Sequence, residues 1–125
     1  MEESKNTDME DQARMMAASE KSDSGDDIPK ISFTVKFKPP HMFEGEKYDE
    51  LDLSKLQELT TKDAEYFDSI MAAMRHFPTD KFRDTKYLKQ VAVRVTGKPV
   101  EFFNTMSMRN FEEVKSRISM YFLFG

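Results

Sequence analysis

Two side chains can exchange protons near neutral pH, namely His41 and His76. A catalytic histidine needs a nucleophile or substrate proton within hydrogen-bond reach and a third group that orients its ring. His41 follows Pro39 and Pro40 in an expected loop, and His76 lies near the expected end of a helix. Neither neighbourhood offers such an arrangement, so we expect a structural or exposed role for both histidines.

Other motifs for catalysis or ligand binding are missing from the sequence. The chain has no Cys, which excludes disulfides, thiolate metal sites and a cysteine nucleophile. The Asp and Glu residues are scattered, and no spacing matches a phosphate-binding loop, a zinc site or a calcium loop. We therefore expect a protein that is not an enzyme and that uses no cofactor and no metal.

Charge is distributed unevenly along the 125 residues. Residues 1–27 carry nine acids and three bases, a net charge of −6, whereas the remainder carries 14 acids and 16 bases, a net charge of +2. Positive charge gathers at five positions: Lys81, Arg83, Lys86, Lys89 and Arg94. Because acids are interspersed nearby, this region is expected to be a solvated face rather than a nucleic-acid-binding surface.

Composition also predicts the compartment and the domain organisation. No stretch approaches the roughly 20 apolar residues of a membrane span, and the acidic N-terminus does not resemble a signal peptide. A cytosolic protein without a membrane contact is expected. Residues 1–28 contain no aromatic side chain and are expected to form a disordered acidic tail, which leaves residues 29–125 as one domain.

The domain is predicted to begin with a β-hairpin. Ile31 to Lys38 alternates apolar and polar residues, which is typical of a strand with one buried face. Pro39 and Pro40 must interrupt the ladder, because proline has no N–H to donate. A turn at Glu44 and Gly45 leads to a second strand from Tyr48 to Leu53. A hairpin alone is marginally stable, so it is expected to pack on helices.

Three helices are predicted after the hairpin. Thr60 and Asp63 can cap the first helix, whose apolar residues are Ala64, Phe67, Ile70, Met71 and Met74, and which should stop near Phe77. The second should start around Asp84 and end at Gly97, with Tyr87, Leu88, Val91, Ala92 and Val95 buried. Lys98 to Met106 is expected to be a connector, and Ser107 to cap the third helix. The expected class is α+β, a hairpin packed on about three helices.

The last predicted helix carries more apolar residues than one face can bury. Its stripe consists of Phe111, Val114, Ile118, Tyr121 and Phe122, and Leu123 and Phe124 follow directly. Successive helical residues are about 100° apart, so residues 121–124 cannot all face one core. We expect Phe111, Val114, Ile118, Tyr121, Phe122, Leu123 and Phe124 to bind a partner. The alternatives are that this end closes over the core or mediates self-association.

Three short blocks follow one another in the first half of the domain: Phe43-Glu44-Gly45-Glu46-Lys47-Tyr48, Leu51-Asp52-Leu53 and Leu59-Thr60-Thr61-Lys62-Asp63. In this order they resemble the opening of tail assembly chaperones of long-tailed bacteriophages, of the Mu and P2 kind. Thr96-Gly97-Lys98-Pro99 and Met108-Arg109-Asn110-Phe111-Glu112-Glu113-Val114 are similar to later blocks of the family. Asn110 stands where the family pattern has Asp. The resemblance covers roughly residues 31–125, and the order and spacing of the blocks carry it.

This resemblance implies a non-enzymatic assembly factor. Members of the family bind the long helical tape measure protein, keep it soluble and help recruit tail tube subunits. The expected location is the cytoplasm of the infected bacterial host, and not the mature virion. The alternatives are a structural tail or head–tail connector protein that stays in the virion and, from another class, a small nucleic-acid-binding regulator.

Overall fold

A computed structural model describes residues 32–125, so the predicted disordered tail, residues 1–28, lies outside the described residues. The elements follow in the order β1 (Thr34–Phe43), β2 (Glu46–Asp52), η1 (Ser54–Glu58), α2 (Thr61–Ala73), η2 (Lys81–Arg83), α3 (Thr85–Thr96), α4 (Val100–Asn104) and α5 (Met108–Phe124). This is the expected α+β arrangement, in which an antiparallel hairpin packs against helices.

Strands β1 and β2 form the predicted hairpin. Glu44 and Gly45 both have positive φ, 49° and 81°, as a two-residue turn between twisted strands requires. Along β1, Val35 and Phe37 are buried, which confirms the alternation. However, β1 continues through Pro39 and Pro40 to Phe43, whereas the sequence placed its end at Lys38. The predicted disturbance is present, because the register shifts between Lys36 and His41.

Side chains from α5 cover much of the outer edge of β1. Asn110 Oδ1 accepts a hydrogen bond from the Lys38 N–H at 2.9 Å, and its Nδ2 donates to the Pro39 carbonyl at 2.8 Å. Arg117 Nη1 donates to the carbonyls of Ser32 and Thr34 at 3.0 and 2.9 Å. These bonds satisfy backbone groups that the irregular ladder leaves without a strand partner.

Helix α2 begins as predicted but ends earlier. The Asp63 carboxylate accepts the Thr60 N–H at 2.9 Å, the bond expected of a cap at this terminus. The helix ends at Ala73 rather than near Phe77. Arg75 adopts a left-handed conformation with φ 55°, and its N–H and that of His76 donate to carbonyls of the last turn. This termination motif usually contains Gly, so no residue here predicted it.

The buried face of α2 is also narrower than its periodicity indicated. Phe67 and Met71 are buried and Ile70 is half-buried, whereas Ala64 and Met74 are exposed. Helix α3 agrees with the prediction throughout. Asp84 caps it, Gly97 ends it with φ 74°, and its buried residues are the five of the predicted stripe.

The predicted connector from Lys98 to Met106 contains the short helix α4, which the sequence analysis missed. Pro99 precedes it in extended conformation, and Phe102 and Phe103 are buried along it. Five residues are little more than one turn, too short to show a helical period. The last helix, α5, starts as predicted, because the Ser107 side chain accepts the Asn110 N–H.

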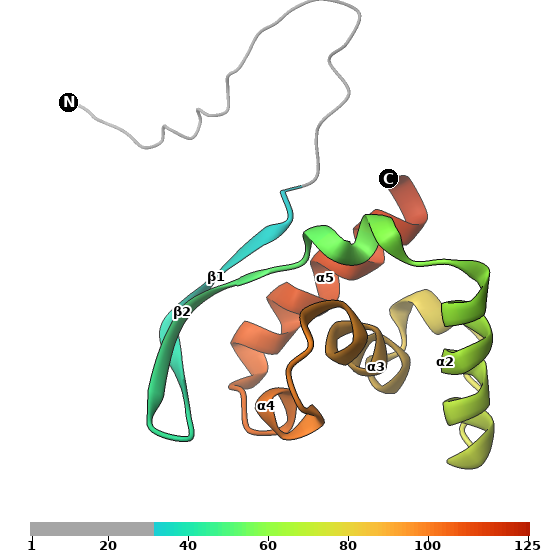
Figure 1. The fold of residues 1–125 in the computed structure, drawn as a ribbon, viewed down its shortest axis with the longest axis horizontal. Helices are drawn as coiled ribbons and strands as arrows, with labels where there is room; N and C mark the ends of the chain where they lie inside the picture. Colours follow the sequence, from blue (N-terminus) through green and yellow to red (C-terminus); the bar gives the residue numbers. More distant parts are fainter. Residues whose placement is uncertain (1–31) are drawn as a thin grey trace, which may run out of the picture. The chain divides into compact units, whose positions relative to one another are not determined.

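Helix α3 occupies the centre of the domain. Figure 1 shows the hairpin beside α5 and α4, with α2 on the opposite side of α3. The buried hydrophobic residues come from all of these elements and form one cluster. They are Val35, Phe37, Leu51, Leu53, Leu56, Phe67, Met71, Tyr87, Leu88, Val91, Ala92, Val95, Phe102, Phe103, Met106, Phe111, Val114 and Ile118. Among residues 32–125, no helix has the length and apolar character that crossing a membrane requires.

Candidate functional site

The residues predicted to bind a partner all lie on α5, and the fold divides them into two groups. Phe111 is 8% exposed, and Val114 and Ile118 are fully buried. These three side chains hold α5 against its neighbours in the core and are not accessible at the surface. Apart from Met108 at the start of the helix, which is 79% exposed, the exposed apolar surface of α5 comes from the residues that follow these three.

The next two aromatic residues are half-buried because other rings cover them. Tyr121 packs on Phe33 with ring centroids 5.9 Å apart. Phe122 stacks on Phe82 of the η2 segment at 4.7 Å, with an interplanar angle of 21°. This end of the helix therefore closes partly over the core, as one of the alternatives from the sequence states.

The last turn of α5 still exposes apolar surface. Phe124 is 74% exposed and Met120 is 44% exposed, while Leu123 is half-buried. We call residues 120–124 the α5 end surface. It lies on a rigid element, because Arg117 joins α5 to two carbonyls before and within β1, and Lys115 Nζ bonds to Thr85 Oγ1 at 2.9 Å.

His41 is a structural residue of the core, and it lies in β1 rather than in the expected loop. Its side chain is 6% exposed, and Nε2 donates to the Phe102 carbonyl at 2.8 Å. The ring also packs edge-on against Phe102 with centroids 4.6 Å apart. Each of these contacts orients a buried group and leaves the ring without access to a substrate.

His76 pairs with a carboxylate, but that carboxylate caps a helix. Its Nε2 lies 2.9 and 2.8 Å from the two oxygens of Asp84. Asp84 Oδ2 also accepts the Tyr87 N–H at 2.9 Å, which satisfies the first turn of α3. The pair therefore fixes the chain between α2 and α3 to the start of α3.

Stability at acidic pH is expected to depend on Asp84. Burial raises its pKa, but the hydrogen bonds from Tyr87 and His76 outweigh burial and hold the pKa below its ordinary value. In the unfolded chain, the carboxyl has a pKa of about 3.9. The contribution of the Asp84 carboxylate to the free energy of unfolding is therefore complete above that pH, and it is lost as the pH falls through the lower pKa of the folded state. Asp84→Asn keeps a cap acceptor and loses the charge, and should cost about 1 kcal/mol at pH 7.

The measurement is urea unfolding of wild type and Asp84→Asn at a series of pH values from 7 to 2. The stability difference should shrink as the pH falls below about 4. Asp84→Ala is the matched control, because it removes the cap as well and should remain destabilised at every pH. A difference for Asp84→Asn that stays constant over the whole range would contradict the assignment.

The predicted basic region is largely neutralised by ion pairs. Lys81 pairs with Asp68 at 3.0 Å, and Arg83 pairs with Asp80 at 2.8 Å. Arg94 pairs with Asp63 at 2.8 Å. Three of the five bases therefore have carboxylate partners, which favours the interpretation of this region as a solvated face.

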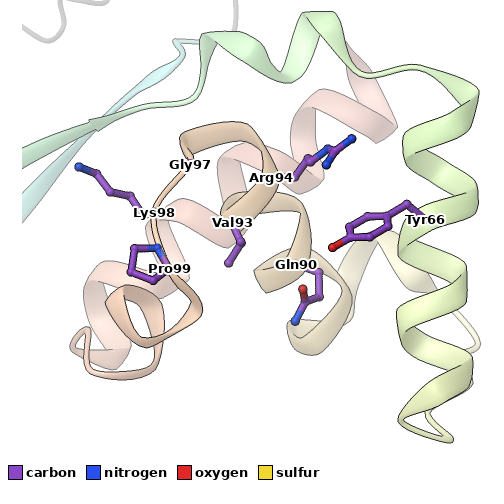
Figure 2. A pocket seen from close by; sticks show the side chains of 7 residues that line it. All are labelled: Tyr66, Gln90, Val93, Arg94, Gly97, Lys98 and Pro99. Atoms are coloured by element: carbon purple, nitrogen blue, oxygen red, sulfur yellow. The ribbon is translucent and has the colours of Figure 1, made fainter.

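A surface pocket between α2, α3 and the segment before α4 was not found by sequence reasoning. Its volume is about 400 Å³. Its lining comes from three elements, and Figure 2 shows the side chains: Tyr66, Gln90, Val93, Arg94, Gly97, Lys98 and Pro99. Six of these residues lie between positions 90 and 99, and three of them belong to the block Thr96-Gly97-Lys98-Pro99, whereas Tyr66 is added only by the packing of α2 on α3.

Within residues 32–125, no group of three or more His, Cys, Asp or Glu side chains is placed to hold a metal ion. Comparison with protein-family models, curated proteins and solved structures finds no match. The candidate sites therefore rest on geometry, and the α5 end surface is the one that the sequence and the fold both indicate.

Proposed function

We propose that this chain is a non-enzymatic assembly chaperone of the phage tail type, which binds a tape measure protein through the α5 end surface and helps recruit tail tube subunits. The observation that carries the proposal is the apolar end of α5, where Phe124 is 74% exposed beside Met120. The ordered sequence blocks that resemble tail assembly chaperones supply the class of client.

The chemistry of this surface suits a helical, apolar client. Phe and Met make large contacts, and Met adapts to irregular partners because its side chain is unbranched and flexible. Residues 120, 123 and 124 have the i, i+3 and i+4 spacing by which helices pack on one another. The surface is small, which fits a chaperone that must later release its client.

The test is co-expression and co-purification with the tape measure protein of the same genome. Wild type should keep this client soluble and form a complex with it. Phe124→Ser should weaken the complex at least about tenfold, as expected when an exposed aromatic anchor is removed. Phe77→Ser is the matched control, because Phe77 is 75% exposed at a site between α2 and η2.

Full client solubility with a folded Phe124→Ser variant, or with residues 120–125 deleted, would remove the α5 end surface from the proposal. No complex at all, together with this protein in purified particles, would favour a structural tail or connector component. Strongly salt-dependent retention on DNA would instead favour a nucleic-acid-binding regulator. Light scattering gives the molar mass of the free protein in solution. A dimer mass for wild type and a monomer mass for Phe124→Ser would instead indicate self-association through the same surface.

A further inference from the structure

Arg94 is held in a fixed position by Asp63. Its Nε donates to Asp63 Oδ1 at 2.9 Å, and its Nη2 lies 2.8 Å from the same oxygen in an ion pair. The other Asp63 oxygen accepts the Thr60 N–H at the start of α2, and the Asp63 side chain is only 13% exposed. The carboxylate is thus fixed by the helix terminus, and it in turn fixes the guanidinium.

Tyr66 fixes the guanidinium from another direction. The Arg94 guanidinium carbon lies 5.1 Å from the centre of the Tyr66 ring, within the range of a cation–π contact. Figure 2 shows Tyr66 reaching from α2 toward α3 at the wall of the pocket. An arginine held in this way loses little side-chain entropy when it binds a further group.

The guanidinium keeps donors for such a group. It has five N–H donors, of which two, one on Nε and one on Nη2, face the Asp63 oxygen. The Arg94 side chain is 52% exposed, and within residues 32–125 its ion pair is with Asp63 alone. Three donors therefore remain for an acceptor in the pocket.

The rest of the pocket matches an anion attached to an apolar group. Val93 and Pro99 give it apolar surface, Gln90 adds an amide, and none of its lining residues is acidic. Lys98 lines the pocket but does not add a second cation to it. Its ammonium lies 4.6 Å from the centre of the Tyr48 ring, and Figure 2 shows the side chain pointing away from Tyr66 and Arg94.

We propose that this pocket is a docking site for an Asp or Glu side chain of a protein partner, with an apolar neighbour of that residue on Val93 and Pro99. The argument is charge complementarity at the outer edge of Arg94, because Asp63 pairs with its inner edge and none of the residues that line the pocket is acidic. Arg94 would donate to the carboxylate, Tyr66 would hold the guanidinium and Gln90 would bond to the partner's backbone. This site is separate from the α5 end surface.

The test uses a capped tripeptide of phenylalanine, glutamate and leucine, titrated into ¹⁵N-labelled protein at low salt. The amide signals of Gln90, Val93, Arg94 and Gly97 should shift, and the twin peptide with glutamine should bind at least about tenfold more weakly. Arg94→Gln should weaken the glutamate peptide by a similar factor. Arg83→Gln is the matched control, because it removes a guanidinium that is also ion-paired, to Asp80, but does not line the pocket, and it should change the affinity less than about twofold.

Three results would overturn the proposal. The first is that no amide signal shifts at the pocket, the second is equal binding of the two peptides, and the third is unchanged binding by folded Arg94→Gln. Each of these results would mean that Asp63, Arg94 and Tyr66 only hold α2 against α3. A glutamine peptide with a free C-terminal carboxylate that binds better than the glutamate peptide would also overturn it. No tape measure protein is used, so this test and that of the proposed function fail independently.

Discussion

Replacing Phe102 by alanine is expected to destabilise the domain by about 3–5 kcal/mol, the largest loss among the substitutions considered. Phe102 is fully buried, and its ring meets those of His41, Phe43 and Tyr48 with centroids 4.6, 5.3 and 5.0 Å apart. The substitution leaves a cavity and removes these edge-on contacts at the junction of α4 with the hairpin. Small domains are typically stable by about 5–15 kcal/mol, so a large unfolded fraction is expected.

Urea unfolding followed by circular dichroism measures this loss, and Phe77→Ala provides the matched control. Phe77 is 75% exposed, so the same substitution there should stay within about 0.5 kcal/mol of wild type. Phe102→Leu should lie between the two, because it retains much of the volume. A loss below about 1 kcal/mol for Phe102→Ala would show that α4 does not pack on the hairpin as described.

The second large effect is expected at Asn110, which is 2% exposed. Its amide accepts from the Lys38 N–H and donates to the Pro39 carbonyl, so the site needs an acceptor and a donor together. Asn110→Asp removes the donor and places a carboxylate against a carbonyl oxygen, which should cost about 2–4 kcal/mol at pH 7. The chaperone pattern that the sequence resembles has Asp at this position, and the two bonds of Asn110 explain why this chain needs Asn.

The cost of Asn110→Asp should fall as the pH is lowered. Burial against a carbonyl raises the pKa of the new carboxyl in the folded state above the unfolded value of about 3.9. The folded state then binds more protons than the unfolded state, so the variant gains stability relative to wild type as the pH decreases. Asn110→Ala should show a loss without this pH dependence. A variant as stable as wild type at pH 7 would contradict the two bonds.

Local signals in the sequence were sufficient for much of the fold. Helix α3 has a polar cap, a stripe of five apolar residues and a terminal Gly, and each of these agrees with the structure. The hairpin turn likewise has Gly45 at a position with positive φ. Most of the sequence blocks that resemble tail assembly chaperones lie at turns or helix ends, namely the hairpin turn, the start of α2, the end of α3 and the start of α5. They describe the fold more directly than a binding surface.

The features that the sequence did not predict depend on tertiary contacts. Helix α2 stops at a left-handed Arg75, which no propensity indicates. The role of Asn110 depends on Lys38 and Pro39, more than 70 residues earlier in the chain. For the candidate site, periodicity identified the apolar residues of α5 but could not say which ones the rings of Phe33 and Phe82 would cover.

The edge of β1 that α5 covers also sets an order of events during synthesis. A two-stranded hairpin is marginally stable by itself, and the groups that complete this one, Asn110 and Arg117, are translated more than 50 residues after its strands. The nascent chain therefore carries residues 34–52 as an unfinished strand pair until α5 has left the ribosome. During that interval, the open edge of β1 is a place where two nascent chains can pair, and the emergence of α5 closes it.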